Sequence, residues 1–159
     1  MARGARSRGR VHGAHDPRLV SAVAGSGSWI DSLDAVLVAR GAGGRPVLVD
    51  RPDLVDHPRV AFAAAVRDEL RVLGRADPGR RDVVIVSRGL AGLTELSLEI
   101  QPSRRGHGAA GNLVADALTS VPAGEIVVAA VSPGNAASLR ALLGAGFTPV
   151  GSMQLFRRA

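Results

Sequence analysis

A glycine- and alanine-rich segment between a strand-like run and a helix-like run constrains the fold of this chain more than any other feature. The segment covers residues 102–112 and reads PSRRGHGAAGN. The residues before it alternate between apolar and polar side chains, whereas apolar residues after it recur at helical spacing. Small residues let backbone N–H groups at the start of a helix come close to a ligand, and such a helix end favours anions. The segment therefore predicts an α/β fold with a phosphate-binding cradle between a strand and a helix.

The rest of the chain alternates short apolar runs with turn residues, which predicts a mixed α/β domain. Strands are expected over 34–40, 46–50, 82–88, 94–101, 125–132 and 147–158, the first two joined in a hairpin by the glycines at 41–44. Helices are expected over 56–74, from the cradle to residue 120, and over 135–144. The predicted order is β-β-α-β-β-α-β-α-β.

Composition limits the class of protein. At 159 residues the chain has the length of one domain, and 46% hydrophobic residues are enough to build a core. With no cysteine, disulfides, cysteine-ligated metals and a thiol nucleophile are excluded, and no metal site is expected. No apolar run approaches the roughly 20 residues of a membrane span, and no signal-peptide pattern follows the first arginines, so we expect a cytoplasmic protein without membrane association. All 20 basic residues are arginines, a bias typical of GC-rich bacterial genes.

The net charge of +6 is concentrated near the N-terminus. Residues 1–18 contain five arginines and one aspartate (+4), whereas the other 141 residues contain 15 arginines and 13 acidic residues (+2). Residues 1–28 show no sustained periodicity, which predicts a disordered arm before a single domain over 29–159. Such an arm can add sequence-independent affinity for nucleic acid, and this alternative stays open. The arm has no aromatic residue for base stacking and the domain is nearly neutral, so nucleic acid is not the expected partner.

Two phosphate-binding patterns known from other folds fit the cradle poorly. Gly106, Gly108 and Gly111 match the dinucleotide fingerprint G-x-G-x-x-G. That fingerprint also needs an acidic residue at the end of the next strand to hold the ribose, but Val131 and Ser132 stand there. A P-loop needs a lysine, and the chain contains none. The first pattern is therefore disfavoured and the second is excluded.

A second frame of the same segment fits a different family. Arg105, Gly108 and Ala110 form the pattern R/Q-x-x-G-x-G/A, and two further motifs follow in order. These are N-x-x-S at Asn135 and Ser138, and Gly-Phe at 146–147. Together the motifs resemble the GNAT N-acetyltransferase superfamily over residues 82–151.

The resemblance implies a GNAT-like fold, in which helices flank a mixed sheet with two splayed strands. It further implies that acetyl-CoA is the acyl donor and that an amine attacks it directly in a ternary complex. The amine would belong to a small molecule, a protein N-terminus or a protein side chain. The pantetheine arm would pair with the strand before the cradle, and the pyrophosphate would lie on the cradle. The residues implied in cofactor binding are Leu98, Glu99, Ile100, Arg105, Gly106, His107, Gly108, Ala109, Ala110, Gly111 and Asn135.

Two carboxylates are candidates for the catalytic base. Glu99 and Glu95 project from the same face of the strand that would line the cofactor. Many GNAT enzymes supply the acid from a tyrosine five residues before the Phe of Gly-Phe, but Leu142 stands there and the chain has no tyrosine. The alternative of a non-catalytic acyl-CoA-binding sensor or regulatory module therefore stays open.

Two parts of the expected fold are shortened. Family members typically finish with two strands, whereas this chain has room for only one after its last helix, so the last strand is expected to be lacking. The N-terminal half carries a single clear helix, which indicates a reduced version of the family's N-terminal half. The substrate side of the site would then be open or completed by a second subunit, so a homodimer is among the expected assemblies.

Overall fold

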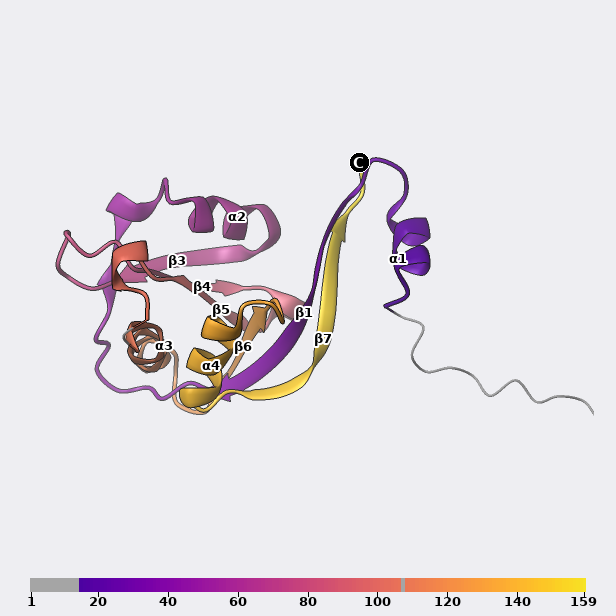
Figure 1. Cartoon of the computed structure of the whole chain (residues 1–159). Helices are drawn as coiled ribbons and strands as arrows, with labels where there is room; N and C mark the ends of the chain where they lie inside the picture. Colours follow the sequence, from indigo (N-terminus) through magenta and orange to yellow (C-terminus); the bar gives the residue numbers. More distant parts are fainter. Residues whose placement is uncertain (1–14, 107) are drawn as a thin grey trace, which may run out of the picture. The chain divides into compact units, whose positions relative to one another are not determined.

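A mixed sheet with the strand order β2-β3-β4-β5-β6-β1-β7 organises the chain (Figure 1). The computed structural model describes residues 15–106 and 108–159. The strands are β1 (Trp29–Arg40), β2 (Val49–Asp50), β3 (Asp68–Gly74), β4 (Val83–Arg88), β5 (Thr94–Glu99), β6 (Ile126–Val131) and β7 (Thr148–Arg157). The helices are α1 (Pro17–Ala24), α2 (Pro58–Val66), α3 (Ala109–Thr119) and α4 (Ala136–Gly144), with 3-10 turns η1 (Pro52–Leu54), η2 (Leu90–Gly92) and η3 (Pro102–Arg104). Residues 34–152 form one compact unit, and residues 15–33 with 153–159 belong to another, so β1 and β7 contribute to both.

The register of the strands in the larger unit determines where its two cores form. β4 pairs antiparallel with β3 and β5, β5 pairs parallel with β6, and β6 pairs antiparallel with β1. Alternate residues of β4 face opposite sides of the sheet. Val84 packs in the main core with residues of α3 and α4, whereas Val83 and Ile85 pack in a second core with residues of η1 and α2. Figure 1 accordingly shows α2 on one side of these strands and α3 and α4 on the other.

A strand replaces the second half of the helix predicted over 56–74. α2 ends at Val66, and β3 follows it. Leu70 and Val72 point into the core beside α2, whereas Leu73 joins the main core, an alternation that a strand produces. Short apolar runs fit both helical and strand patterns, and backbone pairing with β4 decides for the strand here. The helix prediction is therefore wrong beyond Val66.

The predicted hairpin between the first two strands is also wrong. β1 pairs with β6 and β2 pairs with β3. The segment after β1 packs against the loop before β6: the Gly41 N–H donates to the Glu125 carbonyl (2.7 Å), and a Cβ at Gly41 would lie 2.2 Å from the Pro122 carbonyl oxygen. The glycine therefore permits the close approach of two distant segments rather than a tight turn.

The C-terminal part of the sheet combines strands from both ends of the chain. One strand, β7, follows the last helix, as the sequence predicts. The neighbour of β6 is β1, so an N-terminal strand stands between β6 and β7, and this edge of β6 is paired within the chain. Among the described residues, no helix is both long and apolar enough to cross a bilayer.

The smaller unit contains a helix where the sequence predicts a disordered arm. α1 begins at Pro17 after Asp16, whose side chain accepts a hydrogen bond from the Arg18 N–H (2.9 Å). An aspartate N-cap and a proline in the first turn favour this start, but eight residues carry too little periodicity to reveal a helix. Residues 1–14 lie outside the described residues, so the arm over 1–28 and the domain over 29–159 stay predictions.

Candidate functional site

The pairing between β5 and β6 stops part-way along both strands. Thr94↔Val127 and Glu95↔Val128 are the paired positions, although both strands continue beyond them. After Glu95, β5 pairs with β4 alone, and after Val128, β6 pairs with β1 alone. Backbone groups on the two facing edges therefore lack sheet partners, although such groups are strongly driven to pair. This interruption is the splay that the sequence resemblance implies.

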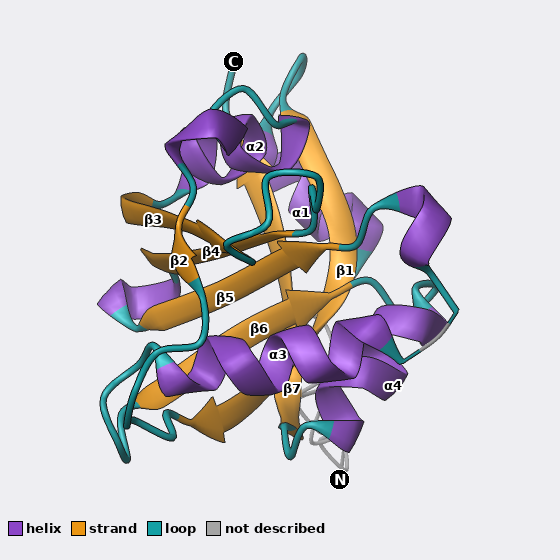
Figure 2. Ribbon diagram, turned by 90° about the vertical axis from the view of Figure 1, so that its left-hand side faces the viewer, coloured by secondary structure: helices purple, strands orange, loops and turns teal. Residues whose placement is uncertain are grey.

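The glycine cradle follows β5 and leads into α3, which runs beside β6 (Figure 2). Gly106 and Gly108 have φ angles of +89° and +71°, in the left-handed region that favours glycine. Gly108 is the N-cap of α3, which starts without a side-chain cap. A Cβ at either glycine would meet no protein atom within 4 Å. The space in front of this turn is therefore open. The predicted cradle residue His107 lies outside the described residues.

No contact within the protein requires a glycine at position 111, in the first turn of α3. A Cβ there would meet no atom within 4 Å, and glycine inside a helix costs about 1 kcal/mol relative to alanine. The first helical hydrogen bond of α3 runs from the Asn112 N–H to the Gly108 carbonyl (3.3 Å). The N–H groups before it, those of Ala109, Ala110 and Gly111, have no carbonyl partner within the helix and point out of its N-terminal end. Three outward donors, a positive helix end and a missing Cβ form a surface that fits a pyrophosphate.

Arg105, within the cradle, contacts the end of β5 and the residue that follows it. Its Nε donates to the Ile100 carbonyl (3.1 Å), and its Nη2 lies 3.5 Å from Glu99 Oε1. Of the residues expected to pair with the pantetheine arm, Leu98 and Glu99 lie in the stretch of β5 that is not paired with β6. Ile100 follows the strand, and its side chain is buried in the main core.

The two glutamates predicted as bases differ in their surroundings. Glu95 is 2% exposed and forms an ion pair with Arg67, whose side chain is 8% exposed. The Glu99 side chain is 34% exposed, and its carboxylate lies 3.6 Å from Arg59 Nε. Glu99 is therefore in contact with solvent and loosely paired with two arginines, Arg59 and Arg105, whereas Glu95 is enclosed in a buried ion pair.

Arg59 and Arg67, near the two ends of α2, are contacts that the sequence analysis missed. Arg67 also donates from Nη1 to Ser97 Oγ (3.0 Å), so it covers the polar face of β5. Each arginine is far in sequence from its partner, and neither belongs to a motif. The available signal was the alternation of Glu95, Ser97 and Glu99, which indicated that this face of the strand needed polar partners.

The last helix exposes Asn135 and buries Leu142. Asn135 is the N-cap of α4, and its Oδ1 accepts a hydrogen bond from the Ser138 N–H (3.1 Å). Its amide nitrogen has no partner among the described residues. Leu142, in the position of the family's tyrosine, is 3% exposed and packs in the main core with Phe147. This position therefore contributes packing and no proton donor.

A cavity of about 180 Å³ lies at the opposite end of β5 from the cradle, beside Thr94. Arg88 Nη1 donates there to Thr94 Oγ1 (2.7 Å) and Glu125 Oε1 (3.0 Å). The hydrogen bond from Thr94, followed by the one from Arg88, lowers the pKa of Glu125. Arg88, Thr94 and Glu125 satisfy one another, whereas the buried Oγ of Ser120, which also lines the cavity, has no partner among the described residues. The sequence motifs lie at the cradle and the splay, which therefore form the candidate site.

Comparison with known proteins identifies the fold through structure alone. No known family model matches the sequence, and no curated protein matches it. A solved protein assigned to the GNAT acetyltransferase family, from Novosphingobium aromaticivorans, matches with a TM-score of 0.54 and 19% identity, over 84% of this chain and 69% of that one. A GNAT-family acetyltransferase from Colwellia psychrerythraea matches with a TM-score of 0.51 and 14% identity, over 82% of this chain and 57% of that one. The chain has the GNAT fold.

The GNAT fold confirms the predicted fold class. Helices flank a mixed sheet, and the strand before the cradle separates from its parallel neighbour after Glu95. At these identities the likeness concerns the fold, and the roles of individual residues stay predictions. In the described part of the chain, no group of three or more potential ligands that could hold a metal occurs.

Proposed function

We propose that the protein is an N-acyltransferase that moves an acetyl or short acyl group from acetyl-CoA to an amine by direct attack in a ternary complex. The observation that carries the proposal is the β5–β6 ladder that ends at Glu95↔Val128. The free edge of β5 leads directly into the glycine cradle at the start of α3. A strand edge that can hydrogen-bond an amide-containing arm, followed by an anion site, suits the pantetheine and pyrophosphate of CoA.

The residues of the site fit this donor. The N–H groups at the start of α3 would bind the pyrophosphate, and the backbone of Leu98 and Glu99 would pair with the pantetheine amides. The exposed amide of Asn135 would contact the donor from α4. Bound acetyl-CoA would supply the activated thioester, whose C–S bond breaks as the amine nitrogen bonds to the carbonyl carbon.

We assign the general base to Glu99. An amine attacks in its neutral form, so the ammonium proton must pass to a base. The partial exposure of Glu99 supports this role, because its carboxylate can take the proton directly or through one water. Glu95, held by Arg67, would position β5 instead. With Leu142 in the core, the departing thiolate would take its proton from solvent.

The class of acceptor, the cytoplasmic location and the homodimer are part of the same proposal. The acceptor is an amine on a small molecule, a protein N-terminus or a protein side chain. The arginine-only basic composition supports a bacterial protein, and acetyl-CoA is a cytoplasmic metabolite in bacteria. β7 is an edge strand, which supports a homodimer formed through it.

A second candidate function is acyl-CoA binding without turnover, in a sensor or regulatory module. The observation that favours it is the buried Leu142 at the tyrosine position, in a chain without tyrosine. The two functions share the donor site and differ only in catalysis.

Two measurements test the proposal. A thermal-shift screen should show stabilisation by CoA and acetyl-CoA and none by NAD. Release of free thiol from acetyl-CoA, measured with a panel of amines, should then reveal turnover, and the protein adds no background because it has no cysteine. Binding without thiol release on any amine would support the sensor, and a stabilising effect of NAD alone would overturn the donor assignment.

A pair of glycine variants tests the cradle itself. Gly111→Leu would place a side chain in the open space at the start of α3, and Gly144→Leu would do the same at the end of α4. We expect the first variant to lose acetyl-CoA binding and the second to keep it. Equal affinities in the two variants would contradict a donor bound on the cradle.

A further inference from the structure

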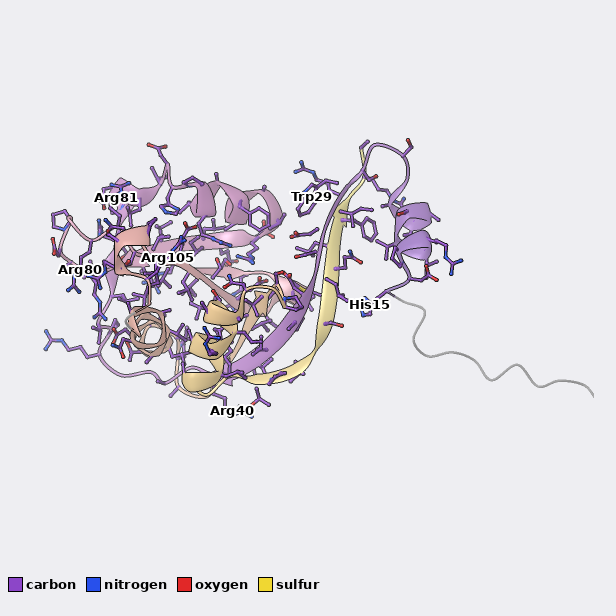
Figure 3. All side chains as sticks on the ribbon, viewed as in Figure 1. His15, Trp29, Arg40, Arg80, Arg81 and Arg105 are labelled. Atoms are coloured by element: carbon purple, nitrogen blue, oxygen red, sulfur yellow. The ribbon has the colours of Figure 1, made fainter. Side chains whose placement is uncertain are left out.

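The cavity of about 180 Å³ lies at the end of β5 that pairs with β6, away from the cradle. Thr94, in its wall, begins β5, and Glu99 ends that strand. Five residue steps along a strand span about 17 Å, so a small molecule in the cavity does not reach the cradle. Figure 3 shows Arg80, Arg81 and Arg105 at the end of the sheet that carries η3. The arginines that line the cavity therefore form a separate set.

The wall of the cavity combines charges of both signs with an apolar surface. Two arginines and two glutamates line it, and Val86, Val121 and Pro122 add apolar side chains. The volume equals that of about six water molecules in the liquid, which is room for a small metabolite. Because the opposite charges balance, the wall suits a molecule that itself carries a positive and a negative group beside an apolar part.

Glu125, in this wall, has one carboxylate oxygen available. Its Oε1 accepts hydrogen bonds from Thr94 Oγ1 and from Arg88 Nη1 (3.0 Å), whereas its Oε2 accepts none from the part of the chain that the structure describes. The same two donors lower the pKa of Glu125, so the carboxylate is charged at neutral pH. A charged oxygen with free lone pairs at the edge of a cavity attracts an ammonium group.

Arg88 has an available donor next to this carboxylate. Its Nη1 donates to Thr94 Oγ1 (2.7 Å) and to Glu125 Oε1, and its Nε lies 3.8 Å from Glu69 Oε2, beyond hydrogen-bond distance. Its Nη2 donates to no group in residues 15–106 and 108–159. The two bonds of Nη1 fix the plane of the guanidinium, and the remaining N–H groups suit a carboxylate.

A buried hydroxyl independently indicates that the cavity holds a polar molecule. Ser120 lines the cavity, and its Oγ is buried without a hydrogen-bond partner among the described residues. Its backbone N–H donates to the Ala117 carbonyl (3.0 Å), so the main chain is fixed and the side chain alone needs a partner. Buried hydroxyls are nearly always paired, because an unpaired one costs free energy. A polar ligand in the cavity would supply the missing partner.

We propose that this cavity is a second small-molecule site, which binds a free α-amino acid with a short side chain. The ammonium group pairs with Glu125 Oε2, and the carboxylate accepts from Arg88 Nη2. The two protein groups are adjacent, with 3.0 Å between Arg88 Nη1 and Glu125 Oε1, and the two charged groups of an α-amino acid are attached to one carbon. The ligand's side chain lies against the apolar wall, and the volume limits its length. The site does not depend on the proposed function, whose base, Glu99, is at the other end of β5.

The test is calorimetric titration of the full chain, without acetyl-CoA, with short L-amino acids and with analogues that lack one charge. Alanine, serine and valine carry both charged groups, propionate carries only the carboxylate, and ethylamine carries only the ammonium group. We expect at least one of the amino acids to bind about tenfold or more tightly than either analogue, the usual size of a lost charge-assisted hydrogen bond. Equal affinity for an analogue, or no binding of any of the three amino acids, would overturn the inference while the proposed function stands.

Variants then locate the bound amino acid. Glu125→Gln keeps an oxygen for the hydrogen bonds from Thr94 and Arg88 and removes the charge, so it should weaken binding by about tenfold or more. Asp56→Asn removes an exposed carboxylate without an ion pair among the described residues and should leave the affinity unchanged. A loss in Glu99→Gln with wild-type affinity in Glu125→Gln would make the amino acid an acceptor at the other end of β5, and would overturn the second site.

A further variant covers the risk that Glu125→Gln weakens the fold. Ser120→Ala removes a buried hydroxyl that has no partner in the described part of the chain, so the protein without ligand should unfold at the wild-type temperature or above it. We expect this variant to weaken amino-acid binding by about twofold to tenfold, the usual contribution of a neutral hydrogen bond. Wild-type affinity in both Ser120→Ala and Glu125→Gln would exclude the cavity as the binding site.

Discussion

The two ends of β5 differ in pairing, burial and charge. At Thr94 and Glu95 the strand pairs on both edges, and the Glu95 carboxylate is buried between Arg67 and the Leu90 N–H. From Leu96 onward the strand pairs on one edge, and it ends at the partly exposed Glu99 beside the cradle. The closed end anchors the strand with interactions inside the protein, and the open end keeps backbone groups and space for a ligand.

The largest expected effect breaks the anchor at the closed end. Arg67→Met leaves the Glu95 carboxylate buried without its ion partner, and such a loss costs about 3–5 kcal/mol. We expect a drop of this size in the free energy of unfolding, measured in urea. The matched variant at the open end, Arg59→Met, removes a partly exposed arginine 3.6 Å from Glu99 and should cost less than about 1 kcal/mol. Equal losses would remove the distinction between the two ends.

The second prediction separates chemistry from stability at the open end. Glu99→Gln removes the proposed base and should lower kcat by about a hundredfold or more, the usual contribution of a general base. Because the Glu99 side chain is 34% exposed, the free energy of unfolding should hardly change. Glu69→Gln removes an exposed carboxylate elsewhere and serves as the control for charge. Wild-type turnover in Glu99→Gln would exclude Glu99 as the base.

A pair of glycine-to-alanine variants compares the space at the two ends. A Cβ at Gly89 would lie 1.9 Å from Glu95 Oε2, so Gly89→Ala has to displace the buried carboxylate and should cost about 1–3 kcal/mol. At Gly111 a Cβ meets nothing within 4 Å, so Gly111→Ala should stabilise α3 by about 1 kcal/mol. Thermal unfolding of both variants measures the difference, and a stabilising Gly89→Ala would contradict the close packing at the closed end.

The smallest expected effect is a pH dependence at the closed end. The hydrogen bond from Thr94, with that from Arg88, holds the pKa of Glu125 below its ordinary 4.5. The stability that this carboxylate contributes is therefore present above about pH 4.5 and is lost as the pH falls through the lower folded-state pKa. Urea unfolding between about pH 5 and 3 should show a smaller loss of stability in Glu125→Gln than in the wild type. Asp56→Asn, at an exposed carboxylate without an ion pair among the described residues, is the control.

The sequence alone predicted the part of the molecule in which neighbours along the chain decide the structure. One continuous stretch of the chain contains the strand 94–99, the glycine turn, α3, β6 and α4. Its periodicities and helix caps depend on neighbours in sequence, and each element predicted for this stretch is present in the structure. The motif residues Gly106, Gly108 and Asn135 have roles in this stretch, as turn and cap positions, that depend on their own backbone angles. The substitution of tyrosine by Leu142 could likewise be read directly from the chain.

Only the tertiary structure decided the contacts between segments far apart in sequence. β3 is a strand because β4 offers it backbone partners, and β1 lies beside β6 because the two form an antiparallel ladder. Gly41 then lets the segment after β1 approach the loop at Pro122. The ion pairs of Arg67 with Glu95 and of Arg104 with Asp82 also join segments that are far apart in sequence. The first anchors the closed end of β5, and the second lies near its open end. Local propensity cannot reveal such pairs, because their free energy arises only when folding brings the partners together and removes them from water.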